Sequence, residues 1–141
     1  MTVIGFNFNE IHVEKKEGVS GKVNIKNNVS IEDVKEHGLD FGGGDQKAVR
    51  FVFKFVSSFE PGLGSIILGG DLVFIGKKDK IKTIVDDWKK SKKVEKEVMA
   101  NILNTVLTKC NIEALIISQK VNLPPPIPMP KVKEAESKDQ K

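Results

Sequence analysis

The chain has few of the residues from which metal centres and disulfides are built. Its 141 residues include one cysteine, Cys110, and two histidines, His12 and His37, which lie far apart in the sequence. One cysteine excludes an internal disulfide and any multi-cysteine zinc or iron–sulfur centre, and two distant histidines leave little for a histidine metal site. We therefore expect no metal and no other cofactor.

Long apolar runs are also missing. No run approaches the roughly 20 residues that a membrane-spanning helix needs, and the stretch from Met1 to Gly5 lacks the basic and then apolar segments of a secretory signal. Hydrophobic residues make up 39% and charged residues 30% of the chain, close to a soluble globular average. These features predict a single cytoplasmic domain that does not span a membrane.

Tyrosine is absent and arginine occurs once, at Arg50, although the net charge is +4. Residues 77–97 hold nine lysines and five acidic residues, so this stretch alone carries an excess of four. A basic patch attracts phosphate backbones or anionic surfaces, but a solvated helix face explains it as well. Tyrosine rings commonly stack on bases, and arginine recognises guanine through two hydrogen bonds, so a chain without tyrosine and with one arginine has little of either. These absences count against the alternative of a nucleic-acid-binding protein that uses the patch from Lys77 to Lys96.

Alternating apolar residues predict two strands in the first third of the chain. Ile4, Phe6 and Phe8 share one face of the first strand, and the alternation then shifts by one residue, which predicts a bulge at residues 9–10. A second strand is predicted over residues 18–33. The glycine-rich stretch at 37–46 makes regular structure costly and predicts a crossover loop between the second and third strands.

A hairpin is predicted in the middle of the chain. Residues 48–59 carry apolar side chains at both odd- and even-numbered positions, which point to opposite faces of a strand. This pattern is typical of a strand that is covered on two sides or that exposes an apolar face. The Pro61-Gly62 pair predicts a tight turn at residues 60–64. A fourth strand then follows over residues 66–75.

The apolar spacing changes to three and four residues after Gly76. Ile81, Ile84, Val85 and Trp88 mark a short amphipathic helix, and a longer helix follows from Val94 and ends before Pro124. Cys110 lies on the apolar stripe of the longer helix, which favours a buried small residue over a nucleophile. The last part of this helix is apolar on more than one face and predicts an interface with a second subunit, formed by Ile112, Leu115, Ile116 and Ile117.

The C-terminal part of the chain is not helical. Residues 124–130 carry five prolines and are predicted to run as extended polyproline, laid along the body or held out as a ligand for another protein. Residues 131–141 are charged, without apolar periodicity, and are predicted to be disordered. The folded domain is thus expected to be residues 1–123.

The order of these elements, four antiparallel strands with a crossover and a Pro-Gly hairpin, then a short and a long helix, resembles the SecB-like fold of protein-export chaperones. The resemblance is strongest from Arg50 to Gly76 and reappears at Asn101-Ile102-Leu103 and at Val121-Asn122-Leu123-Pro124-Pro125. It implies an α+β domain that forms a homo-oligomer, a tetramer or a dimer. It also implies a non-enzymatic chaperone, a holdase for unfolded polypeptides before export or folding.

Apolar grooves would receive such clients, because apolar contact tolerates many sequences. Six aromatic residues are candidates to line a groove, with core packing as the alternative: Phe51, Phe53, Phe55, Phe59, Phe74 and Trp88. The basic composition, with a pI of about 9.1, departs from the acidic chaperones that dock on an export motor. The alternative function for the same fold is a protein-interaction adaptor that works through residues 124–130.

No catalytic constellation accompanies these features. The glycine clusters at 42–44 and 62–64 match neither the dinucleotide fingerprint nor the phosphate loop. We therefore expect a binding protein and not an enzyme.

Overall fold

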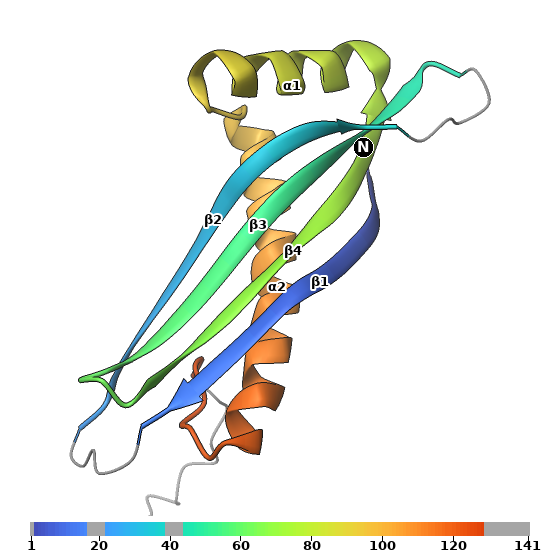
Figure 1. The fold of residues 1–141 in the computed structure, drawn as a ribbon. Helices are drawn as coiled ribbons and strands as arrows, with labels where there is room; N and C mark the ends of the chain where they lie inside the picture. The colour runs from blue at the N-terminus through green and yellow to red at the C-terminus, as the bar shows by residue number, and fades with distance from the viewer. Residues whose placement is uncertain (1, 17–21, 39–43, 129–141) are drawn as a thin grey trace, which may run out of the picture.

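The computed structural model describes residues 2–16, 22–38 and 44–128. Four strands precede two helices: β1 (Thr2–Lys15), β2 (Asn24–His37), β3 (Gln46–Glu60), β4 (Gly64–Lys77), α1 (Lys78–Ser91) and α2 (Lys96–Lys120) (Figure 1). The predicted α+β class, with four strands followed by a short and a long helix, is confirmed. The predicted tail at 131–141 lies outside the described residues.

The strands form one antiparallel sheet in the order β1-β4-β3-β2. β2, β3 and β4 are neighbours in sequence and in space, whereas β1 lies beside β4, which is a Greek-key arrangement. The crossover predicted between the second and third strands is therefore wrong, because it is β1 and β2 that lie at opposite edges. Glycine marks a break in regular structure but does not reveal which strands pair across it.

The local register agrees with the sequence pattern in part, because further shifts between Val3 and Gly5 of β1 and between Ile31 and Asp33 of β2 were not predicted. The pairing of β1 with β4 shifts between Phe8 and Glu10, so the bulge predicted at residues 9–10 is confirmed. The β3–β4 turn is also confirmed: the Leu63 amide donates to the Phe59 carbonyl at 2.9 Å, and Gly62 has a φ of 66°. A glycine suits that left-handed conformation because it has no Cβ. β2 begins at Asn24 and continues to His37, later at both ends than predicted.

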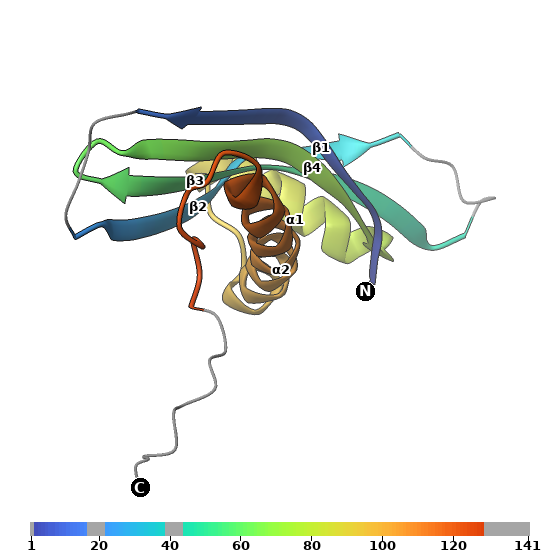
Figure 2. The same cartoon turned by 90° about the horizontal axis from the view of Figure 1, so that it is seen from below.

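Both helices lie on the same face of the sheet (Figures 1 and 2). Alternate residues of β3 and β4 point toward them and form the core with the inner stripes of α1 and α2. Charged and apolar side chains alternate on the other face, where Arg50, Val52 and Lys54 remain partly exposed. Neither helix in the described ranges has the combination of length and apolarity that crossing a membrane requires.

The chain after α2 turns back onto the body. The Leu123 amide donates to the Ser118 carbonyl at 2.9 Å, and the Asn27 side-chain Nδ2 on β2 donates to the Pro126 carbonyl at 2.8 Å. Pro126 is buried. Of the two arrangements predicted for the proline segment, residues 124–128 show the one laid along the body.

Candidate functional site

The six aromatic residues named as groove candidates lie in the core, which was the alternative given for them. Phe51, Phe55 and Phe74 are 0% exposed, Phe53 and Phe59 are 1% exposed, and Trp88 is 7% exposed. Those on β3 and β4 sit at alternate positions on the face that the helices cover, where burial of an aromatic side chain stabilises the fold most. The groove assignment is corrected accordingly: these six side chains pack between the sheet and the helices and do not line one exposed apolar groove.

The four residues predicted as an oligomer interface divide between core and surface. Ile117 is 5% exposed and packs in the core, and Leu115 is half-buried. Ile112 and Ile116 are 56% and 45% exposed, which is unusual for isoleucine. Ile112, Leu115 and Ile116 form what we call the α2 outer face.

A second apolar surface lies on β1, at the edge of the sheet. Phe6, Ile11 and Val13 pair with Leu72, Leu68 and Ile66 of β4, whose side chains are buried on the helix-covered face. The helices pack mainly on β2, β3 and β4, so the same face of β1 is left incompletely covered. Ile11 is 54% exposed. Together the half-buried Phe6, Phe8 and Val13 and the exposed Ile11 form what we call the β1 strip.

Aromatic contacts hold the upper part of the β1 strip in place. The Phe6 ring stacks on Phe53 with 5.0 Å between centroids, and the Phe8 ring meets Phe53 edge to face at 6.1 Å. Such pairs contribute about 0.5–1.5 kcal/mol beyond the burial of their area. The strip is therefore a fixed surface that is continuous with the core.

The β1 strip and the α2 outer face lie on one flank of the molecule. Lys109 of α2 places its Nζ 6.0 Å from the centre of the Phe6 ring. Ile112 and Ile116 follow Lys109 by three and seven residues, and this spacing puts all three on one side of a helix. Sequence periodicity identified the apolar face of β1 but not its position at the edge, which alone leaves Ile11 exposed.

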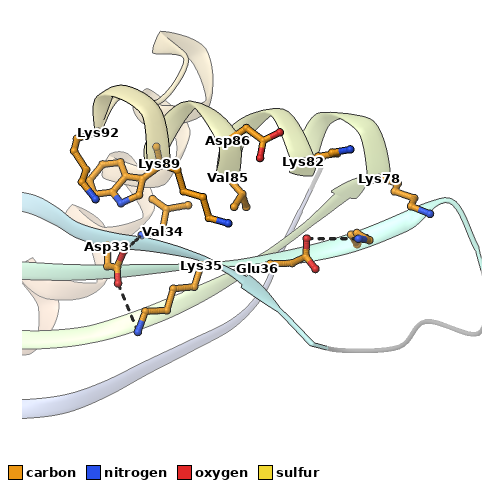
Figure 3. A pocket seen from close by; sticks show the side chains of 12 residues that line it. Asp33, Val34, Lys35, Glu36, Lys78, Lys82, Val85, Asp86, Lys89 and Lys92 are labelled. Atoms are coloured by element: carbon orange, nitrogen blue, oxygen red, sulfur yellow. Dashed lines mark hydrogen bonds and ion pairs between the residues drawn. The ribbon is translucent and has the colours of Figure 1, made fainter.

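A cavity of about 580 Å³ lies between the edge strand β2 and α1 (Figure 3). One wall is the stretch of β2 from Asp33 to Glu36, and the other is the face of α1 that carries Lys78, Lys82 and Lys89. Trp88 also lines the cavity, and Lys92 places its Nζ 5.5 Å from the centre of the Trp88 ring. This part of the predicted basic patch therefore borders a cavity and is not merely a solvated helix face.

The remaining potentially reactive side chains, Cys110 and His37, show no arrangement among the described residues that would activate them. Burial, together with the nearby charge of Glu113, raises the pKa of the Cys110 thiol to about 12, so the unreactive protonated form prevails at neutral pH. His37 Nδ1 lies 3.2 Å from an Arg50 guanidinium nitrogen. Within the described ranges, no three histidine, cysteine or acidic side chains are grouped so that they could hold a metal ion.

Comparison with known proteins gives one informative result. No protein-family model matches the chain, and no curated protein matches it in sequence. Among solved structures, the chain is similar to the SecB-like chaperone of Mycobacterium tuberculosis in complex with a peptide from an antitoxin. The TM-score is 0.50 at 5% identity, over 94% of this chain and 91% of that one. The chain therefore has the SecB-like fold.

Proposed function

We propose that the protein is a holdase that binds non-native polypeptides on the β1 strip. The observation that carries this proposal is the uncovered apolar edge of the helix-covered face, where Ile11 is 54% exposed beside half-buried phenylalanines. The SecB-like fold supports it, as does the similar chaperone, which was solved with a bound peptide. The proposed clients are cytoplasmic polypeptides that await folding or export.

Two physical features of β1 suit an unfolded chain. Apolar contact stabilises a complex by about 25 cal/mol per Å² buried and is indifferent to the order of residues in the client. β1 is also an edge strand, and a row of unpaired main-chain groups along such an edge can pair with an added extended segment. Both features select for an extended, apolar and non-native chain over a folded surface.

We further propose that copies of the chain associate through the α2 outer face, as the sequence predicted for Ile112, Leu115 and Ile116. Exposed isoleucines one helical turn apart present a compact apolar surface that a second helix can cover. Ile117 has no part in this interface because it is buried within the subunit.

The chaperone proposal is tested by light scattering from an aggregating unfolded protein, with and without this chain. Wild-type protein is expected to suppress aggregation near stoichiometry. Ile11→Asp places a charge on the strip and should reduce the suppression about tenfold, because an apolar contact is replaced by a carboxylate that must be desolvated. His12→Asp is the matched control, since His12 is the exposed neighbour on the opposite face of β1.

Equal loss of suppression in the two variants would show that the β1 strip is not the binding surface. Absence of suppression by wild-type protein would refute the holdase proposal itself.

A further inference from the structure

The cavity between β2 and α1 has an uneven charge balance. Six lysines and three acidic residues line it: Lys35, Lys47, Lys78, Lys82, Lys89 and Lys92, with Asp33, Glu36 and Asp86. Two of the acids are already paired, Asp33 with Lys35 and Glu36 with Lys47, each at 3.5 Å. Among the described residues the other four lysines form no ion pair, and only Asp86 remains to offset them. The cavity is therefore complementary to an anion.

A buried donor without a partner lies in the wall of the same cavity. Trp88 is 7% exposed, and its indole Nε1 makes no hydrogen bond to any described residue. Leaving a buried N–H unsatisfied costs about 1–3 kcal/mol. The Lys92 ammonium lies 5.5 Å from the centre of the same ring, so the unpaired indole nitrogen belongs to a residue that borders the lysines of the cavity. This observation is independent of the lysines and also indicates a missing acceptor.

The four unpaired lysines of the cavity are spread along the length of α1 and are not gathered at one place. Lys78 and Lys92 stand at the two ends of α1 in Figure 3, and 14 residues of helix at 1.5 Å each separate them by about 21 Å. An extended peptide covers that length in about six residues. A single small anion would meet only one or two of the lysines, whereas an elongated ligand with repeated negative groups meets all four.

The composition of the cavity favours carboxylates over a nucleic acid. Its lining includes no arginine, and its one aromatic residue is the buried Trp88, so no ring is available for a base to stack on. One main-chain donor of β2 is already paired at this point, because the Val34 amide donates to the Asp33 carboxylate at 2.9 Å. The ligand is therefore held by its side chains and does not extend the sheet.

We propose that this cavity binds a short acidic polypeptide segment in extended form, with carboxylates against Lys78, Lys82, Lys89 and Lys92 and one acceptor at Trp88 Nε1. The site is separate from the β1 strip and does not depend on the holdase function. Its partner is a protein that carries a run of aspartate or glutamate, whether in a disordered tail or in a loop.

Trp88 makes the test direct because it is the one tryptophan in a chain without tyrosine. The full chain is titrated at low salt with an end-blocked oligoglutamate of about six residues, and tryptophan emission is followed. We expect a saturable change that weakens steeply as salt is added. An oligoglutamine of the same length should produce no change.

Two double variants separate the cavity from general charge. Lys82→Gln with Lys89→Gln removes two lysines that line the cavity and should weaken binding about fivefold to tenfold. Lys80→Gln with Lys90→Gln removes the same charge from exposed positions of α1 outside the cavity and should leave the affinity within about twofold. All four lysines are exposed, and circular dichroism checks that the fold is kept.

Three results would overturn the proposal. The first is no saturable change in emission with oligoglutamate at low salt. The second is equal weakening in the two double variants, which would reduce the effect to net charge. The third is tighter binding of a single-stranded RNA of matched charge with the same dependence on Lys82 and Lys89, which would make the cavity a nucleic-acid site.

Discussion

Removing the two exposed isoleucines of α2 should dissociate the proposed oligomer. The double variant Ile112→Ala with Ile116→Ala keeps a strong helix former at both positions. It leaves the core intact, because the buried stripe of α2 is formed by other residues, among them Val106, Cys110 and Ile117. Any effect on assembly is then an effect on the α2 outer face alone.

The size of the effect follows from the exposed fractions. Full burial of an isoleucine side chain stabilises by about 1.5–3 kcal/mol, and Ile112 and Ile116 still expose 56% and 45% of their surface. Each therefore has about 1 kcal/mol left to gain at an interface. In a two-fold symmetric contact both copies contribute, so the four side chains are worth about 4 kcal/mol. That corresponds to about a thousandfold in the dissociation constant.

Multi-angle light scattering over a range of concentrations measures the outcome. Wild-type protein is expected to run as a dimer or tetramer and the double variant as a smaller species. Ile4→Ala serves as the control, because Ile4 is 46% exposed on β1 and should not alter the mass. A monomeric wild-type protein, or an unchanged mass for the double variant, would refute the assignment of the interface.

Two further predictions concern the stability of the fold. At Gly70→Ala the new Cβ would overlap the Asn7 carbonyl oxygen and lie 3.0 Å from Phe53 Cζ, so unfolding should be easier by about 2–3 kcal/mol. Chemical denaturation measures this against Gly38→Ala, where a Cβ meets nothing within 4 Å, and equal midpoints would contradict it. Because burial and Glu113 raise the pKa of Cys110 to about 12 from 9.0, the thiol should resist alkylation at pH 8 until the chain is unfolded. Rapid labelling of the native protein would contradict this assignment. Between pH 9 and pH 12 only the unfolded thiol ionises, so the contribution of the buried neutral thiol to folding stability is complete below pH 9 and is lost as the pH rises toward 12.

The local elements were determined by the sequence itself. Apolar residues alternate along β1, and the alternation shifts after Phe8. This pattern predicted both the strand and the bulge at residues 9–10, because side chains of a strand alternate between faces whatever the strand pairs with. A spacing of three and four residues set the two helices and placed Cys110 on a buried stripe. The Pro61-Gly62 pair set the β3–β4 turn. These signals depend on contacts between residues that are near one another in the chain.

The candidate sites were decided by the tertiary structure. Periodicity tells which residues share a face but not whether that face is covered. The sequence therefore left Phe51 and Phe53 of β3 open between a groove and the core, and the structure buries both while Ile11 of β1 lies exposed. The difference arises because β3 is central and β1 is at the edge, and strand order depends on pairing between distant segments. The cavity behind Trp88 has the same origin, since β2 and α1 are about 50 residues apart in the chain and only the packed fold turns a lysine-rich helix toward an edge strand.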